Sequence, residues 1–276
     1  RQNANPTHKA GAESNPKNTA NRRWPSQTPT RISEESMARV ALVTGGTRGI
    51  GEAISVALKN AGYTVAANYG GNDKAAQEFT ARTGIPAYKF DVSDYDAVTA
   101  GIAKIEQDIG PIDILVNNAG ITRDGVLAKM TFETWNKVIQ TNLSSCFNTC
   151  HSVVGGMRER GFGRIVNIGS VNGQAGQYGQ VNYASAKSGI HGFTKALALE
   201  LASKHVTVNA IAPGYVDTEM VRAVPEEILA KIIKTIPMGR LGKPEDIARS
   251  VLFLVADDAD FITGSTLSIN GGQHMY

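Results

Sequence analysis

The length, composition and charge of the chain exclude several classes of function. Its 276 residues, 42% of them hydrophobic and 19% charged, are enough to bury one large core. Residues 1–36 hold six Lys/Arg and three Glu, which accounts for the whole net charge of +3 and leaves the rest neutral. A neutral balance argues against nucleic-acid binding, which needs a concentrated basic surface. No apolar run approaches the roughly 20 residues of a membrane span, so we expect a cytoplasmic protein without membrane or nucleic-acid partners.

Residues 1–36 differ in composition from the rest of the chain. They are rich in Asn, Pro, Thr, Ser and Arg and hold almost no large aliphatic residues, which predicts a disordered tail. The segment Ser33-Glu34-Glu35-Ser36-Met37 is what a purine-rich ribosome-binding site before a start codon would encode. We therefore expect the tail to be non-native sequence and the fold to occupy residues 37–276. The alternative is an organelle transit peptide, but such peptides are amphipathic and poor in acidic residues, unlike this tail.

From Met37 onward, short β-rich runs alternate with longer amphipathic runs, which is typical of βαβ units on a parallel sheet. The predicted strands are Val40–Thr44, Thr64–Asn68, Ala87–Asp91, Ile112–Asn117, Arg164–Ile168, Thr207–Ala212 and Thr266–Asn270. The expected fold class is therefore α/β, a single-domain, doubly wound, Rossmann-type parallel sheet of about seven strands with helices on both faces. In such a sheet the ligand site lies at the carboxyl ends of the strands.

The two cysteines, Cys146 and Cys150, are four residues apart in a predicted helix. That spacing places both on one face of the helix with poor geometry for a disulfide, so we expect reduced packing residues. No histidine cluster accompanies them, and we expect no metal site.

A glycine-rich turn follows the first predicted strand and opens a helix that is expected to end near Ala61. It reads Thr44-Gly45-Gly46-Thr47-Arg48-Gly49-Ile50-Gly51. Glycines allow close approach to a pyrophosphate, and the helix N-terminus offers free N–H groups. The second strand ends at Asn68 without a carboxylate for a ribose 2′-hydroxyl, whereas Arg48 could pair with a 2′-phosphate. This favours NADPH over NADH, and we expect the nearby Asn72-Asp73 to cap the next helix.

The chain from Met37 to Tyr276 resembles the short-chain dehydrogenase/reductase family. The matching motifs are the glycine turn, Asn117-Asn118-Ala119-Gly120, Asn142, Ser170, Tyr183-Ala184-Ser185-Ala186-Lys187 and Pro213-Gly214. The resemblance implies a dinucleotide-binding reductase domain in which Asn117 supports the central strand. The cofactor residues predicted from the turn and the resemblance together are Gly45, Thr47, Arg48, Gly49, Ile50, Gly51, Asn68, Asp91, Val92, Asn118, Ala119, Gly120, Tyr183, Lys187, Pro213, Gly214, Val216 and Thr218.

The predicted catalytic residues are Asn142, Ser170, Tyr183 and Lys187. Reduction of a carbonyl needs a hydride at carbon and a proton at oxygen. Tyr183 is the candidate acid, and Lys187 lies one helical turn further on the same face, where its ammonium should lower the pKa of the phenol. Ser170 follows a strand and could hold the substrate oxygen. By the resemblance, Asn142 supports a water-mediated proton path to Lys187.

The segment between Ser170 and Tyr183 is rich in glutamine and glycine and could bind an acyl thioester. The predicted substrate residues are Ser170, Gln174, Gln177, Tyr178, Gln180 and Tyr215. We expect a mobile lid between Val216 and Pro237 whose helix spans residues 226–236. This loop and its neighbours are similar to those of the family's reductases of acetoacetyl-CoA, which implies conversion of that substrate to (R)-3-hydroxybutyryl-CoA for polyhydroxybutyrate synthesis.

Two other functions remain open at this stage. The first is reduction of 3-oxoacyl groups on acyl carrier protein, an acidic partner that needs basic docking residues. The charges in Arg158–Arg164 are interrupted and Lys204 stands nearly alone, which favours an acyl-CoA. The second is a non-catalytic dinucleotide sensor, which the retained Tyr183 and Lys187 disfavour. The resemblance also implies a homotetramer that associates through the helices carrying Asn142 and Tyr183 and through the C-terminal region.

Overall fold

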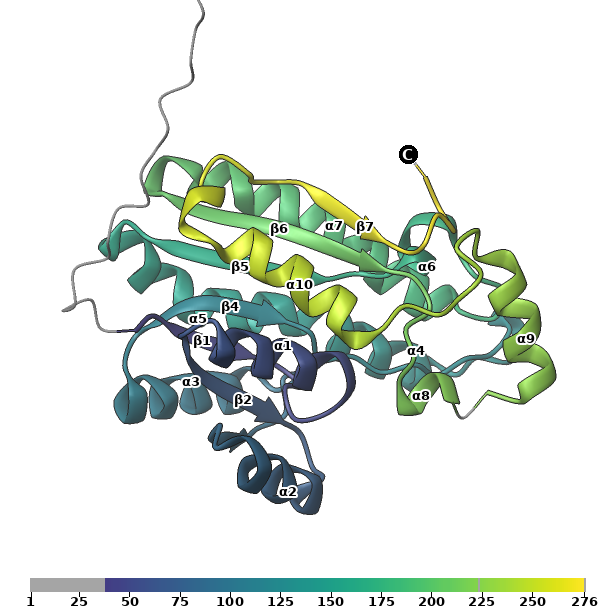
Figure 1. Ribbon diagram of the computed structural model, residues 1–276, viewed down its shortest axis with the longest axis horizontal. Coiled ribbons are helices and arrows are strands. Elements are labelled where there is room, and N and C mark those ends of the chain that lie inside the picture. Colours follow the sequence, from purple (N-terminus) through teal and green to yellow (C-terminus); the bar gives the residue numbers. More distant parts are fainter. Residues whose placement is uncertain (1–37, 223, 276) are drawn as a thin grey trace, which may run out of the picture. The chain divides into compact units, whose positions relative to one another are not determined.

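A parallel sheet forms the centre of the protein, and helices cover both of its faces (Figure 1). This computed structural model describes residues 38–222 and 224–275, so the predictions for residues 1–36 lie outside the described residues. The strands are β1 (Val40–Val43), β2 (Thr64–Tyr69), β3 (Ala87–Lys89), β4 (Ile112–Asn117), β5 (Gly163–Ile168), β6 (Val206–Pro213) and β7 (Thr266–Ile269). They are arranged in the order β3-β2-β1-β4-β5-β6-β7, and all neighbours are parallel. The predicted doubly wound fold is confirmed.

The helices alternate with the strands along the chain. They are α1 (Gly49–Asn60), α2 (Asp73–Thr83), α3 (Tyr95–Ile109), α4 (Phe132–Ile139), α5 (Ser145–Arg160), α6 (Val171–Ala175), α7 (Val181–Leu201), α8 (Glu219–Arg222), α9 (Glu226–Thr235) and α10 (Pro244–Val255). Short 3-10 turns are η1 (Leu127–Lys129), η3 (Ala202–Lys204) and η4 (Asp257–Ala259), and η2 (Gln140–Ser144) is a π-helical turn. In the described part of the chain, no helix combines the length and apolarity needed to cross a membrane.

All seven predicted strands are present, and their ends differ only slightly from the predicted ones. The third strand is the main difference, because it ends at Lys89 and not at Asp91. The Asp91 carboxylate accepts hydrogen bonds from the backbone N–H and the hydroxyl of Ser93, which turns the chain out of the sheet. The predicted cap of α2 is confirmed, since the Asn72 side chain accepts a hydrogen bond from the Ala75 N–H.

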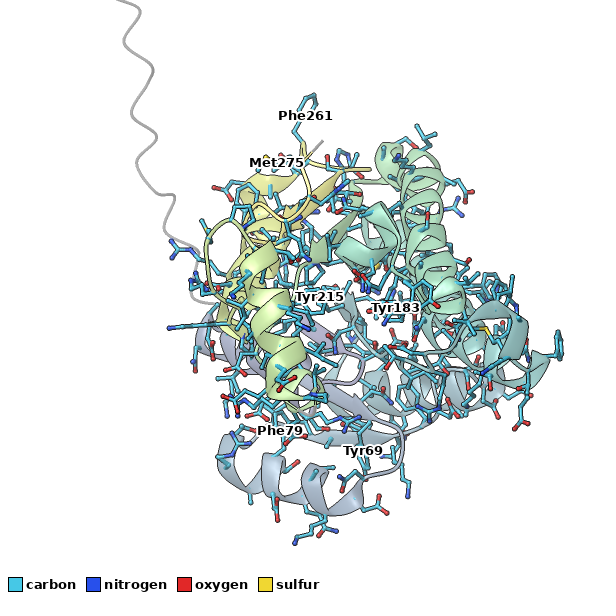
Figure 2. The ribbon with its side chains drawn as sticks, turned by 90° about the vertical axis from the view of Figure 1, so that its right-hand side faces the viewer. Tyr69, Phe79, Tyr183, Tyr215, Phe261 and Met275 are labelled. Carbon is cyan, nitrogen blue, oxygen red and sulfur yellow. The ribbon has the colours of Figure 1, made fainter. Side chains whose placement is uncertain are left out.

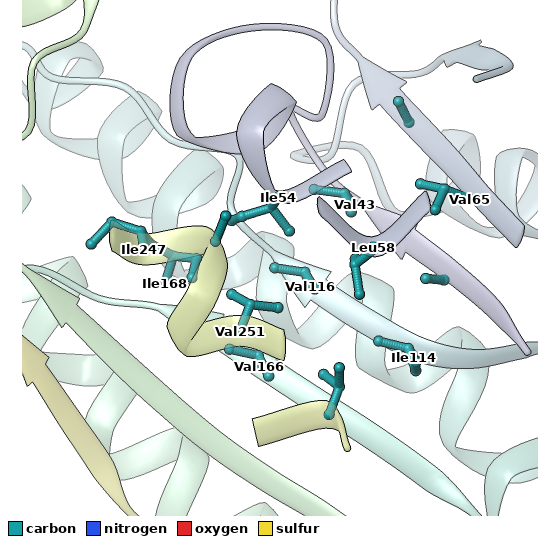
Figure 3. Close-up of a cluster of buried hydrophobic side chains, with 14 of the residues drawn as sticks. Val43, Ile54, Leu58, Val65, Ile114, Val116, Val166, Ile168, Ile247 and Val251 are labelled. Carbon is teal, nitrogen blue, oxygen red and sulfur yellow. The ribbon is translucent and has the colours of Figure 1, made fainter. Parts of the chain in front are cut away.

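Two hydrophobic clusters attach the helices to the sheet. On one face, Ile54 and Leu58 of α1 lie beside Val251 of α10 above the strands (Figure 3). The labelled strand residues of this cluster are Val43, Val65, Ile114, Val116, Val166 and Ile168. On the other face, α3, α5 and α7 cover the sheet, with Met157 and Leu201 among their buried residues. Strands buried on both faces explain the nearly continuous apolar runs in the sequence.

The strand order reverses between β1 and β4, and the chain leaves these two strands in opposite directions along the sheet. Such a switch point opens a crevice at the carboxyl edge. The Thr44 hydroxyl accepts hydrogen bonds from the N–H groups of Asn118 and Ala119, each at 3.0 Å, and so joins the loops after β1 and β4. The loops carrying the predicted site residues therefore meet at one edge.

A buried polar network fixes α5 and α7 against the middle of the sheet. Asn117 of β4 donates to Asn167 of β5 at 2.9 Å and accepts from Thr149 of α5 at 2.7 Å. Asn167 in turn donates to the Thr194 hydroxyl of α7 at 2.9 Å. Because buried polar groups are costly when unpaired, this network favours a single placement of both helices. Asn117 thus has the supporting role that the resemblance implied.

Candidate active site

The glycine turn between β1 and α1 has a backbone that side chains would disrupt. Gly45 and Gly49 have φ of +59° and +55°, in the left-handed region that favours glycine. A Cβ on Gly51 would lie 2.1 Å from the Gly45 carbonyl oxygen. Arg48 is the N-cap of α1 and makes no side-chain capping hydrogen bond, so the first N–H groups of the helix stay available to an anion. A Cβ on Gly49 would lie 3.7 Å from the Thr218 side chain, so Thr218 lies beside the glycine turn.

The end of β2 is occupied by buried polar contacts. Asn68 is 1% exposed; its side chain accepts from the Gly45 N–H at 3.3 Å and donates to the Phe90 carbonyl at 2.9 Å. This residue therefore supports the glycine turn, and its predicted contact with the cofactor stays a prediction. Asp73 pairs with Lys89 at 2.9 Å and accepts from the Tyr69 hydroxyl.

Asp91 and Val92, two of the predicted cofactor residues, lie shortly after β3. The Asp91 carboxylate, half exposed, lies 3.3 Å from the Lys137 amine, while Val92 is buried. The Val92 carbonyl accepts a hydrogen bond from Asn148 of α5 at 3.0 Å. These contacts fix the edge of the crevice on the side of β3.

Lys187 and Asn142 are both buried behind the loop that follows β4. Lys187 is 4% exposed, and its amine donates to the Ile168 carbonyl at the end of β5, at 2.7 Å. Asn142 lies in the π-helical turn, and its amide both accepts from the Ile121 N–H and donates to the Ile121 carbonyl, at 2.7 and 2.8 Å. A Cβ on Gly120 would lie 3.1 Å from the Asn142 amide oxygen and 3.5 Å from the Lys187 amine. The turn Gly120-Ile121 is thus held between these two residues.

Tyr183 lies one helical turn before Lys187 on α7, and the Lys187 amine is 5.8 Å from the centre of its ring. The Ser170 hydroxyl, which caps α6 by accepting from the Asn172 N–H at 3.1 Å, also hydrogen-bonds to the Tyr183 phenol. Tyr215 approaches from the loop after β6, and Figure 2 shows it near Tyr183 in the middle of the molecule. The structure therefore brings the predicted proton donor and the predicted oxygen-binding serine together.

The ionisation of this group departs from the sequence-based expectation. Burial raises the pKa of Tyr183 above its usual value; the Ser170 hydrogen bond opposes this shift, while Asp124 and Tyr215 add to it. Burial also lowers the pKa of Lys187 to about 8. The prediction that Lys187 lowers the pKa of Tyr183 is wrong for this state, because the phenol is desolvated and the amine donates to a backbone carbonyl.

Comparison with known proteins identifies the family. Residues 45–274 match the short-chain dehydrogenase model described as Enoyl-(Acyl carrier protein) reductase. The chain belongs to the short-chain dehydrogenase/reductase family.

Similar proteins cover almost the whole of the described chain. An acetoacetyl-CoA reductase from Rhizobium meliloti (strain 1021) is 65% identical over 240 residues, which are 87% of this chain and 100% of the relative. An acetoacetyl-CoA reductase from Shinella zoogloeoides is 65% identical over 238 residues, which are 86% of this chain and 99% of the relative. A 3-oxoacyl-[acyl-carrier-protein] reductase from Vibrio harveyi is 44% identical over 239 residues, which are 86% of this chain and 98% of the relative. Reductases of this family use a nicotinamide dinucleotide, which the open N-terminus of α1 fits.

The family motif Pro213-Gly214 lies at the carboxyl end of β6. Pro213 ends the strand, Gly214 donates to the Ile269 carbonyl at 2.9 Å, and Val216 is buried against Gly242. Thr218 lies beside Gly49 of the glycine turn, and its contact with the cofactor stays a prediction. The helix predicted for residues 226–236 is present as α9, one residue shorter.

The four predicted substrate residues of the glutamine-rich segment fall into two groups. Gln174 donates to the Ser268 hydroxyl of β7 at 3.1 Å, and the Gln180 amide has protein partners at both of its polar atoms. Gln177 and Tyr178 are exposed, Tyr178 to 87%. The exposed pair is therefore available to a substrate, whereas the other two glutamines already hold the loop in place.

Sequence reasoning left two supporting residues unassigned. Thr44 joins the loops after β1 and β4, and Asn182, which is fully buried, donates to the Arg123 carbonyl at 2.9 Å. Their positions directly before the glycine turn and directly before Tyr183 are the only signals in the sequence. Neither residue type predicts a partner so distant along the chain.

The buried amine of Lys187 predicts a pH dependence of stability. Its pKa is lowered from 10.5 to about 8, so between these values the unfolded chain binds a proton that the folded protein lacks. The free energy of unfolding should therefore rise with pH in that window. Relative to that of Lys187→Met, the free energy of unfolding of the wild type should rise by on the order of 1–2 kcal/mol between about pH 7 and about pH 9.5. Urea unfolding of both proteins without cofactor measures the difference, and a difference independent of pH contradicts this assignment.

Proposed function

We propose that this protein is an acetoacetyl-CoA reductase, which uses NADPH to form (R)-3-hydroxybutyryl-CoA and so supplies the monomer of polyhydroxybutyrate. One observation carries the proposal. Ser170 and Tyr183 are hydrogen-bonded beside Lys187 at the carboxyl edge, in a chain 65% identical to an acetoacetyl-CoA reductase over that relative's full length.

The bound cofactor supplies the hydride, which is added to the carbonyl carbon of the substrate. The Ser170 hydroxyl holds the carbonyl oxygen against Tyr183, and the phenol donates its proton to that oxygen. The raised pKa of Tyr183 keeps the phenol protonated near neutral pH, which suits an acid. In this proposal Lys187 binds the ribose hydroxyls of the cofactor, and Asn142 supports the path by which the phenol regains its proton.

The choice of NADPH is supported by the charges around the end of β2. Arg48 is exposed at the N-terminus of α1. The nearest acid after β2, Asp73, is engaged by Lys89 and Tyr69. A guanidinium without a competing carboxylate favours a 2′-phosphate over a 2′-hydroxyl.

Arg48→Gln tests the choice of cofactor. Loss of the guanidinium should raise the KM for NADPH roughly 10-fold or more, because a charge-assisted bond to phosphate is worth about 1.5–3 kcal/mol. The KM for NADH should change little, since NADH has no 2′-phosphate. Initial-rate kinetics with both cofactors measure the two constants. An equal change for both cofactors contradicts the assigned role of Arg48.

Tyr183→Phe tests the catalytic role. The variant should lose most turnover of acetoacetyl-CoA while its affinity for NADPH, measured by fluorescence titration, stays near that of the wild type. Retention of turnover excludes Tyr183 as the acid. If the wild type reduces no 3-oxoacyl thioester at all, a non-catalytic dinucleotide sensor is the better description.

The same assay distinguishes coenzyme A from acyl carrier protein as the carrier of the substrate. The wild type should turn over acetoacetyl-CoA with a higher kcat/KM than the matched acyl-carrier-protein thioester, since the charges of Arg158–Arg164 are interrupted and the more similar relatives are acetoacetyl-CoA reductases. The reverse preference favours a function in fatty-acid synthesis.

We infer that the protein is a homotetramer. Large apolar side chains are exposed on both faces: Phe147 of α5 (51%), Leu199 of α7 (84%), Phe253 of α10 (55%) and Phe261 before β7 (99%). Figure 2 shows Phe261 projecting from the surface. Burial of these groups against further copies of the chain would remove them from water. Light scattering should give the mass of four chains, and the mass of one chain contradicts the inference.

A further inference from the structure

The loop after β4 is attached to the beginning of α7 by a set of hydrogen bonds that the catalytic scheme does not use. The Gly125 N–H donates to the Gly179 carbonyl at 2.7 Å, and the buried Asn182 donates to the Arg123 carbonyl at 2.9 Å. Residues 123–125 therefore lie across the N-terminus of the helix that carries Tyr183.

A second set of bonds runs from this loop to Ser170. Gln180 donates to the Asp124 carboxylate at 2.9 Å, and its amide oxygen accepts from the Asn172 side chain, also at 2.9 Å. The backbone N–H of Asn172 donates to the Ser170 hydroxyl at 3.1 Å. The hydrogen bonds therefore run from the Asp124 carboxylate through Gln180 and Asn172 to the Ser170 hydroxyl, which binds Tyr183.

The position of Asp124 also matters electrostatically. The groups that face the Tyr183 phenol are Ser170 after β5, Tyr215 after β6, Asp124 after β4 and Lys187 on α7 itself. Among them Asp124 carries a negative charge, and it raises the pKa of the phenol. The guanidinium of the adjacent Arg123 donates to the Thr122 carbonyl, not to this carboxylate.

We propose that Asp124 is a positioning residue for the reduction, which holds Ser170 and the start of α7 in register through Gln180 and Asn172. The charge of this carboxylate also opposes ionisation of the Tyr183 phenol. This inference rests on the proposed function. Its two components, the hydrogen bond and the charge, can be separated by substitution, because an asparagine keeps an oxygen acceptor for Gln180 and lacks the charge.

Asp124→Asn and Asp124→Ala form the test. In Asp124→Asn, kcat at neutral pH should stay near the wild-type value, while the basic limb of the pH profile of kcat moves to lower pH, because the phenol ionises more readily. In Asp124→Ala, kcat should fall roughly 10-fold or more, since misplaced reacting groups lose rate. The KM for NADPH should be unchanged in both. Asp258→Asn, which removes the same charge from η4, is the control and should leave kcat and its pH profile unaltered.

An unchanged pH profile in Asp124→Asn overturns the electrostatic part of the proposal, and wild-type kcat in Asp124→Ala overturns the positioning part. Absorbance titration of the phenolate, with Tyr183→Phe as the blank, supplies a readout that needs no substrate. If the wild type reduces no 3-oxoacyl thioester but the titration midpoint of Asp124→Asn still falls, the proposed function fails and the electrostatic coupling stands. If the midpoint does not move, the coupling is refuted whatever the substrate.

Discussion

The placement of the active site depends on one buried contact, between the amine of Lys187 and the carbonyl of Ile168. An ammonium removed from water is costly unless it is hydrogen-bonded, so α7 cannot slide along β5 without breaking a bond that little else can replace. Ser170 lies two residues beyond Ile168, and Tyr183 lies one turn before Lys187. A register that pairs Lys187 with Ile168 therefore also pairs Tyr183 with Ser170, and the polar network from Asn117 to Thr194 fixes α7 further along its length.

The sequence predicted that Lys187 prepares Tyr183 for proton transfer by shifting its pKa. In the structure, burial determines the direction of that shift. Desolvation raises the pKa of Tyr183 and lowers that of Lys187, so both groups are drawn toward their neutral forms in the absence of cofactor. A neutral phenol is the form that can donate a proton to a carbonyl. In the proposed direction of reduction, burial thus keeps the phenol in the form of an acid without the help of Lys187, whose proposed role is at the cofactor.

How much of the structure the sequence predicts depends on how far apart in the chain the interacting residues lie. The strands were predictable because a strand buried on both faces must be apolar along its whole length, and the glycine turn because its backbone excludes side chains. The spacing of Tyr183 and Lys187 is local to one helix. The sign of the pKa shift was not predictable, because it depends on burial that distant elements create. The partners of Gln174 and Gln180 escaped prediction for the same reason: Ser268 and Asp124 are far away in the sequence.

The glutamine-rich loop between Ser170 and Tyr183 has fixed parts next to these two residues and an exposed part between them. Gln174 and Gln180 are tied to β7 and to the loop after β4, so the part of the segment next to Ser170 and Tyr183 is held in place. Between them, Gln177 and Tyr178 are exposed and can meet an acyl chain or its carrier. Under the proposed function, a substitution at the exposed pair changes substrate binding without displacing Tyr183, whereas a change at the tied pair disturbs the segment next to Ser170 and Tyr183.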